Sequence, residues 1–137
     1  MSNDTPLIEW RDDSLSVGLE EMDATHREFI DLLNRLARAD DAAFLALFRE
    51  MLEHTRAHFQ RENANMEESG FPPIAIHQGE HARILDELDR LTDGLETGDL
   101  EAARNYVCQY LPEWFSMHAA TMDRALAWHL KASGLRH

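Results

Sequence analysis

Apolar side chains recur every three or four residues along most of this 137-residue chain, with polar residues between them. This spacing places the apolar side chains on one face of an α-helix. It predicts helices at about residues 20–39, from Phe44 to Gly70, at about 74–93, and from Asp99 to about 128. Residues 1–18 show no such period and are predicted to form an irregular N-terminal arm.

The predicted breaks between the helices carry residues that stop or start helices. Gly70 is followed by Phe71, Pro72 and Pro73, which favours a helix end and a restart. Asp93-Gly94 is predicted to end the third helix, and Asp99 is a candidate N-cap for the fourth.

Pro112 falls inside the fourth predicted helix. A proline there removes one backbone hydrogen bond and crowds the preceding turn. We therefore expect either a kink between Cys108 and Pro112 or a later start of this helix.

Four helices joined by short polar turns predict an all-α, up-down-up-down four-helix bundle. The length is that of one domain, so residues 1–137 are taken as a single unit. Within it, residues 1–18 form the arm and about 20–128 form the helical bundle.

The composition excludes some classes of partner. The formal net charge is −13 and the pI is about 4.9, which argues against nucleic acids and anionic membrane surfaces. No run of about eighteen apolar residues is present to span a membrane. Cys108 is the only cysteine, so no intramolecular disulfide can form, and we expect a cytoplasmic protein with Cys108 packed as a small apolar residue.

Candidate metal ligands lie on the inward faces of all four predicted helices. They are the single His26 and the pairs His58-x3-Glu62, His77-x3-His81 and His118-x4-Asp123. A helix turns about 100° per residue, so side chains four apart share one face and can reach one metal. Five residues rotate about 140°, so we expect Asp123 to approach from a point where its helix frays or bends.

Any one of these histidines, taken alone, is better explained as a hydrogen-bonded core residue. Burying five imidazoles and two carboxylates together would cost several kcal/mol per unpaired charge, which a shared metal centre avoids. Seven ligands exceed the four of a tetrahedral zinc, and this donor set suits two iron ions. If both carboxylates and a solvent-derived oxygen bridge the ions, five imidazoles divide as three and two and leave one coordination position open.

These residues resemble the hemerythrin family, in particular its bacterial single-domain form, from Trp10 to about Trp128. Besides the seven candidate ligands, the resemblance rests on Trp10, on Asp23 three residues before His26, on Phe59 and on Trp114. It implies a four-helix bundle that binds dioxygen reversibly at two non-haem irons with an oxo or hydroxo bridge.

The resemblance also implies a division of the ligands. His77, His81 and His118 would hold the coordinatively saturated iron, and His26 and His58 the open one, with Glu62 and Asp123 bridging. The matching pocket residues are Phe29, Phe59, Trp114, Phe115 and Ala119. The family usually has leucine at position 115 and isoleucine at 119, so we hypothesise that Ala119 opens a path to the iron and speeds oxidation of the oxygenated protein.

Three polar residues also depart from the family pattern. His54 stands where tyrosine is common and is predicted either to cap the outer edge of the site or to act as a proton donor or extra ligand near the His26 iron. Thr25 and Asn63 replace residues more often seen as glutamine and glutamate. His129 and His137 lie outside the set and are expected to be exposed.

Other metalloprotein classes fit the sequence less well. No Glu-x-x-His motif of the ferritin-like di-iron proteins occurs, and no His-Glu-x-x-His motif of zinc proteases. A zinc site at His77-x3-His81 would leave His26, His118 and Asp123 unexplained.

Oxygen storage, transport or delivery is the function that the sequence favours, because few acid-base groups accompany the expected pocket. An oxygen-using enzyme is a candidate recipient. The alternatives are a di-iron enzyme acting on nitric oxide or peroxide, and an oxygen sensor working through a partner protein. The sequence does not determine the oligomeric state.

Overall fold

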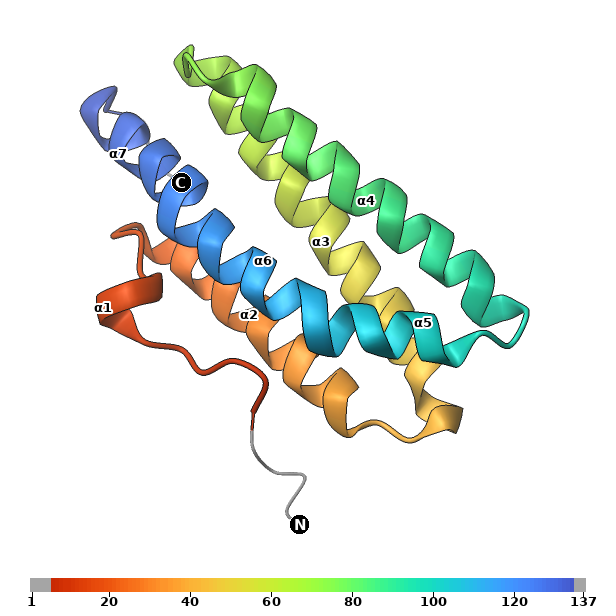
Figure 1. The fold of residues 1–137 in the computed structure, drawn as a ribbon. Helices are drawn as coiled ribbons and strands as arrows, with labels where there is room; N and C mark the ends of the chain where they lie inside the picture. The colour runs from red at the N-terminus through yellow and green to blue at the C-terminus, as the bar shows by residue number, and fades with distance from the viewer. Residues whose placement is uncertain (1–5, 135–137) are drawn as a thin grey trace.

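The computed structural model describes residues 6–134, which form a bundle of four long helical segments (Figure 1). The first three are α2 (Glu20–Arg38), α3 (Asp41–Ser69) and α4 (Ile74–Glu96). The fourth runs without interruption through α5 (Leu100–Asn105), η1 (Tyr106–Tyr110), α6 (Leu111–His118), η2 (Ala119–Asp123) and α7 (Arg124–Ala132). A short helix α1 (Asp12–Leu15) precedes them, and residues 6–134 contain no strand, so the predicted all-α bundle is confirmed.

Most helix boundaries follow the residues that predicted them. Asp99 caps the fourth segment by accepting a hydrogen bond from the amide of Ala102 at 3.4 Å, and Gly70 ends α3 in the left-handed conformation with a φ of 65°. The prediction that Asp93-Gly94 ends the third helix is wrong, since α4 continues to Glu96. The chain turns instead at Gly98, which has a φ of 97°.

The distortion expected near Pro112 is a π-helical turn. Residues Tyr106–Tyr110 form η1, immediately before Leu111 and Pro112. Pro112 has no amide hydrogen to donate to Cys108, and a wider turn at this point accommodates that loss and the proline ring. The helix begins at Leu100, so the expected late start is wrong, and the π-helical turn lies where the kink was predicted.

The apolar core is divided into two clusters. The larger one occupies one end of the bundle. It includes four fully buried residues, Leu33, Phe48, Leu88 and Val107. The smaller one brings Met66, Phe71, Leu126 and Leu130 together near the other end. The candidate ligands lie between these clusters along each helix, so a polar layer crosses an otherwise apolar interior.

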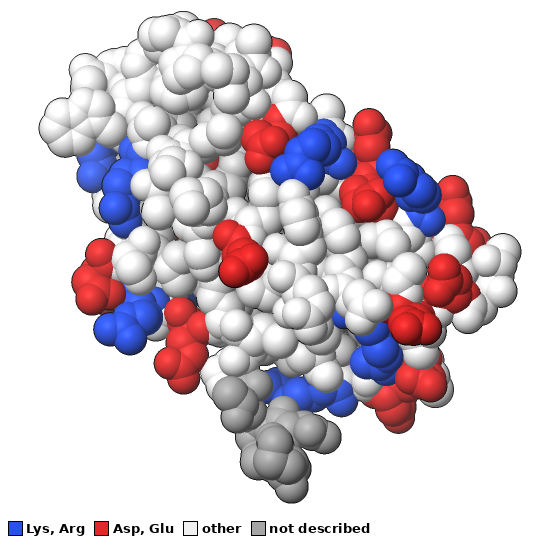
Figure 2. Space-filling model, viewed as in Figure 1, with Lys and Arg blue, Asp and Glu red and all other residues white. Residues whose placement is uncertain are grey.

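The surface carries both signs of charge. On the face seen in Figure 2, acidic and basic side chains are interspersed and neither forms a continuous patch. Within residues 6–134, no helix combines the length and the apolar character needed to cross a membrane.

The N-terminal arm is fixed to the bundle by polar contacts. The Asp23 carboxylate accepts hydrogen bonds from Ser16 Oγ at 2.6 Å and from the Val17 amide at 2.9 Å. Arg124 donates to the carbonyl oxygens of Ser14 and Ser16. The predicted arm is thus largely irregular but tied down, and its residues 1–5 lie outside the described part of the chain.

Substituting Asp23 with alanine tests this attachment. The change leaves the buried Val17 amide without its acceptor, so the free energy of unfolding should fall by about 2–3 kcal/mol. Urea denaturation of Asp23→Ala is compared with Asp31→Ala, an exposed residue on the same helix paired with Arg35. The control should change stability by no more than about 0.5 kcal/mol, and equal effects of the two would contradict the proposed attachment.

Candidate metal centre

Seven buried polar side chains from all four helical segments meet in the middle of the bundle. Helix α2 supplies one, α3 two, α4 two and the fourth segment two. They are His26, His58, Glu62, His77, His81, His118 and Asp123, each at most 5% exposed. The structure therefore brings together every residue that the sequence predicted as a ligand.

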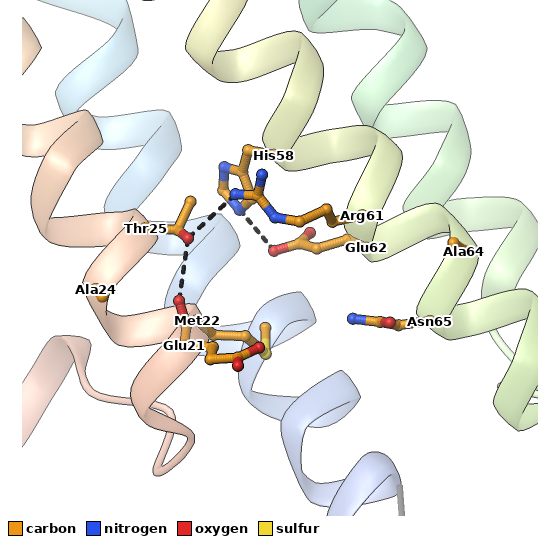
Figure 3. A pocket seen from close by; sticks show the side chains of 9 residues that line it. All are labelled: Glu21, Met22, Ala24, Thr25, His58, Arg61, Glu62, Ala64 and Asn65. Carbon is orange, nitrogen blue, oxygen red and sulfur yellow. Dashed lines mark hydrogen bonds and ion pairs between the residues drawn. The ribbon is translucent and has the colours of Figure 1, made fainter. Parts of the chain in front are cut away.

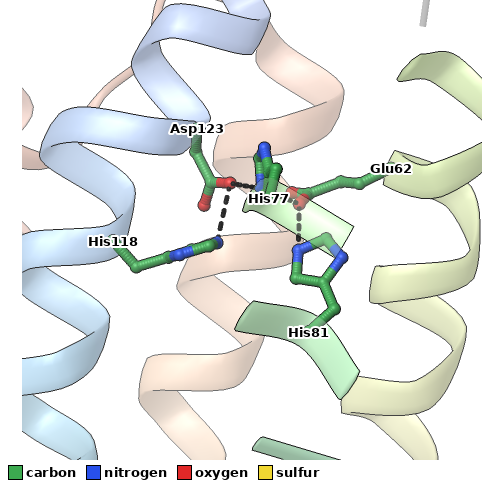
Figure 4. A group of neighbouring side chains, drawn as sticks. All are labelled: Glu62, His77, His81, His118 and Asp123. Carbon is green, nitrogen blue, oxygen red and sulfur yellow. Dashed lines mark ion pairs between the residues drawn. The ribbon is translucent and has the colours of Figure 1, made fainter. Parts of the chain in front are cut away.

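Two groups of potential ligand atoms share the two carboxylates. In the first group, shown in Figure 4, Nε2 of His77 and of His118 lie 3.1 and 3.2 Å from Oδ1 of Asp123. Nε2 of His81 lies 3.1 Å from Oε1 of Glu62. The potential ligand atoms of these five residues all lie within 4.8 Å of one another.

The second group uses the other oxygen of each carboxylate. His58 Nε2 lies 2.7 Å from Oε2 of Glu62, and His26 Nε2 lies 3.1 Å from Oδ2 of Asp123. Each carboxylate thus directs one oxygen to the three-histidine group and the other to the two-histidine group. This is the arrangement expected of carboxylates that bridge two metal ions.

A π-helical turn places Asp123 in the site. Residues Ala119–Asp123 form η2, and the helix then continues as α7. In a π turn the hydrogen bond spans five residues instead of four, so a residue five positions after His118 returns close to the same face. Of the two outcomes expected at Asp123, fraying is wrong, because the helix widens by one residue and continues as α7; a bend stays a prediction.

Electrostatics within the cluster couples the histidines to the carboxylates. Burial alone lowers the pKa of His26, but its contacts with Asp123 and Glu62 outweigh burial and raise that pKa to about 10. The same balance raises the pKa of His77 to about 9, whereas burial dominates at His81 and lowers its pKa.

The carboxylates respond in the opposite sense. Burial raises the pKa of Glu62, yet His58 and the other imidazoles outweigh it and hold that pKa well below its usual range. At Asp123, burial and the charge of Glu62 raise the pKa, and His118 and His26 more than reverse the effect. Both acids are therefore anionic near neutral pH.

The buried donor and acceptor atoms fit a metal better than they fit one another. Nε2 of His26, His77, His81 and His118 and both oxygens of Asp123 are buried within the described chain without a hydrogen-bond partner. Unpaired buried polar atoms are costly. Cations placed among them would satisfy all of them, and nitrogen with carboxylate oxygen is a donor set that iron accepts.

Aromatic rings cover one side of the cluster. Phe59 stacks on His81 with ring centres 3.9 Å apart, Trp114 stacks on His118 at 4.6 Å, and Phe115 meets His26 edge-on. With Phe29, they line a cavity of only about 10 Å³. Four of the five predicted pocket residues thus surround it, and Ala119 is buried nearby without lining it.

His54 belongs to neither group of potential ligands. Its Nε2 lies 3.0 Å from Oε1 of Glu28 on α2, and its ring centre is 6.5 Å from that of His58. The structure places it at the outer edge of the site, as one of the two predictions for it states.

Two further contacts support the ligands from outside. Nδ1 of His81 lies 2.9 Å from the amide oxygen of Asn63, and because that oxygen can only accept, Nδ1 carries the proton and Nε2 is free to bind a cation. Trp114 donates from Nε1 to Glu80 at 2.9 Å. The sequence marked Asn63 as a departure that affects hydrogen bonding around the candidate ligands, and it gave no signal for Glu80, which lies outside the apolar stripe of α4.

The remaining histidines have other surroundings. His129 is half-buried and its Nε2 lies 2.9 Å from the carbonyl oxygen of Ser69, so the expectation that it is exposed is wrong. His137 lies outside the described residues.

Comparisons with known proteins agree with this geometry. The sequence profile described as "Hemerythrin HHE cation binding domain" matches residues 17–128. A bacteriohemerythrin of Ralstonia nicotianae is 36% identical over 129 residues, which cover 94% of this chain and 93% of the relative. A bacteriohemerythrin of Stenotrophomonas maltophilia is 30% identical over 92% of this chain and 83% of its own length.

Solved structures show the same fold. The crystal structure of wild-type hemerythrin superposes with a TM-score of 0.83 at 19% identity, covering 90% of this chain and 98% of that one. A leucine-to-alanine hemerythrin mutant gives a TM-score of 0.85 at 18% identity, with 92% and 98% covered.

Enlarging the aromatic cavity tests its apolar character. Phe115→Leu should open space beside His26 that stays dry, at a cost in unfolding free energy of roughly 1–2 kcal/mol. Xenon NMR should then report binding near the cluster. Phe48→Leu, which alters an equally buried ring in the larger core cluster, should lose similar stability without creating a xenon site near the histidines. Absence of xenon binding in Phe115→Leu would show that the space fills with water or collapses.

Proposed function

The chain belongs to the hemerythrin family, and on this basis we propose that it binds dioxygen reversibly at a pair of non-haem irons. Hemerythrins are oxygen-binding proteins, and the buried histidine and carboxylate cluster fits a non-haem di-iron site. The observation that carries the proposal is that each carboxylate contacts the three-histidine group with one oxygen and the two-histidine group with the other.

We assign the ligands according to those groups. His77, His81 and His118 would hold one iron, His26 and His58 would hold the other, and the carboxylates of Glu62 and Asp123 would serve both, with an oxo or hydroxo group completing the centre. The group of His26 and His58 would then offer one imidazole fewer than the other group and leave room for a small molecule. When bound, the two irons supply the two electrons that dioxygen takes up on binding and returns on release.

The protein's own residues hold and shield this centre. Asn63 fixes the His81 ring, and the bridging carboxylates keep a negative charge that balances the cations. Phe29, Phe59, Trp114 and Phe115 form an apolar wall that offers no acid or base to a bound molecule. This wall supports oxygen binding over catalysis.

The cellular role proposed is oxygen storage, transport or delivery, with an oxygen-using enzyme as the recipient. A cytoplasmic location is supported by Cys108, the single cysteine, since a protein without disulfides suits a reducing compartment.

Iron content combined with optical spectra tests the function directly. The protein, reduced without oxygen, exposed to air and then purged, should contain two irons per chain and show a visible charge-transfer band that appears in air and fades on purging. Two irons with an irreversible diferric spectrum in air would instead favour an enzyme acting on nitric oxide or peroxide. Zinc in place of iron would reject the proposal.

The contact between Asn63 and His81 provides a second test. Asn63→Leu removes the acceptor while keeping the side-chain volume, and loss of such a contact lowers metal affinity by about 10- to 100-fold. Iron retained in competition with a chelator measures the effect. Asn105→Leu alters an exposed asparagine far from the cluster and should retain iron as the wild type does. Equal retention by both variants would show that Asn63 does not support His81.

A further inference from the structure

A second cavity, distinct from the aromatic one, also reaches the centre. It is a pocket of about 390 Å³ between α2 and α3, drawn in Figure 3. Ala24 and Thr25 form part of its α2 wall, and Arg61 and Asn65 part of its α3 wall, while His58 and Glu62 also line it. The aromatic cavity has about 10 Å³, so this pocket is the roomier approach to the two-histidine group.

Arg61 spans the mouth of the pocket. Its guanidinium donates a hydrogen bond to Thr25 Oγ1 at 3.2 Å, joining α3 to α2 (Figure 3). The Thr25 hydroxyl in turn donates to the carbonyl oxygen of Glu21 at 3.0 Å. A single solvent-exposed hydrogen bond holds this bridge, so the Arg61 side chain can leave and return at low cost.

The charge of Arg61 is not neutralised by an ion pair. Among residues 6–134, no carboxylate oxygen lies within 4 Å of its guanidinium. The acids that line the pocket are Glu21, which is exposed, and Glu62, whose oxygens face the imidazoles. On a chain of net charge −13, an unpaired cation beside a pocket favours small anions there.

We propose that this pocket is the route by which water and small anions reach and leave the His26/His58 half of the centre, and that Arg61 makes the route selective for anions. The inference rests on the proposed di-iron centre, because His58 and Glu62 are its ligands. It assigns the aromatic wall and the α2–α3 pocket different tasks: the wall excludes water, and the pocket admits charged and hydrated species.

Azide is the probe for the route, since its coordination to ferric iron is followed by absorbance. In stopped-flow mixing with the diferric protein, Asn65→Phe and Ala24→Phe, which fill the pocket from opposite walls, should each slow azide association by tenfold or more. The control is Ala82→Phe, a substitution of an exposed alanine on α4 that lines none of these pockets. If azide associates with both Asn65→Phe and Ala24→Phe (the plugged variants) at the wild-type rate, the proposal is overturned.

Charge selectivity is tested with a matched pair on α3. Arg61→Gln keeps a donor for Thr25 but removes the charge, so azide association at low salt should fall about three- to tenfold and lose most of its dependence on ionic strength. Arg56→Gln makes the same charge change at a residue that pairs with Asp89, outside the pocket. If the two variants behave alike, Arg61 merely braces the helices and the selectivity is refuted.

A measurement on the metal-free protein separates the route from the iron chemistry. Diethyl pyrocarbonate reaches His58 through this pocket, whereas His77 lines a different one with Phe71 and Ile76. The plugged variants should slow modification of His58, mapped by peptide mass spectrometry, and leave that of His77 unchanged. If His58 is modified at the wild-type rate in the variants with a filled pocket, the proposed route is overturned even when the iron centre is intact. A wild-type protein that takes up no iron would instead refute the proposed function.

Discussion

The burial of two carboxylates at the centre of the bundle is the constraint on which the rest of the structure depends. Glu62 and Asp123 are 2% and 0% exposed, far from the water that normally solvates such groups. Their charges are tolerable only if cations or hydrogen-bond donors surround them, and imidazoles from all four helical segments lie against them where they could hold such cations. A helix rotated by one residue would remove its imidazole from this layer. The polar layer therefore fixes the rotation of each helix, which apolar clusters on either side would specify less strictly.

Regular helical geometry explains how much of the centre could be predicted from the sequence. His58 with Glu62 and His77 with His81 are four residues apart on α-helices, so their shared faces follow from the helical repeat. His118 and Asp123 meet only because η2 adds one residue to a turn, and an apolar stripe does not specify such an insertion. The sequence did indicate a distorted helix near η1, because Pro112 has no backbone N–H to donate. Gly94 misled the prediction of the α4 end: its cost of about 1 kcal/mol inside a helix is offset where Leu95 packs into the core.

Contacts between helices account for what the sequence could not supply. His54 lies on the same stripe as His58, which suggested an inward role, but Glu28 on α2 offers it a partner at the surface. The contacts of Asn63 with His81 and of Glu80 with Trp114 likewise join residues that are distant in the chain. Periodicity along one helix gives the direction of a side chain and says nothing of the polar group that the neighbouring helix presents. Partners of the ligands were therefore less predictable than the ligands themselves.

The aromatic cavity and the α2–α3 pocket differ in ways that bear on the proposed oxygen binding. Reversible binding needs a site without water or acids, and the aromatic side meets this with stacked rings and almost no free volume. The pocket between α2 and α3 does not exclude water, because it is wide enough for solvent and is lined by His58 and Glu62. Sequence comparison drew attention to Ala119, yet this residue is buried in the core and lines neither opening. Under the proposed function, the time for which dioxygen stays bound should therefore depend less on the packing of the aromatic wall than on how often the hydrogen bond between Arg61 and Thr25 opens.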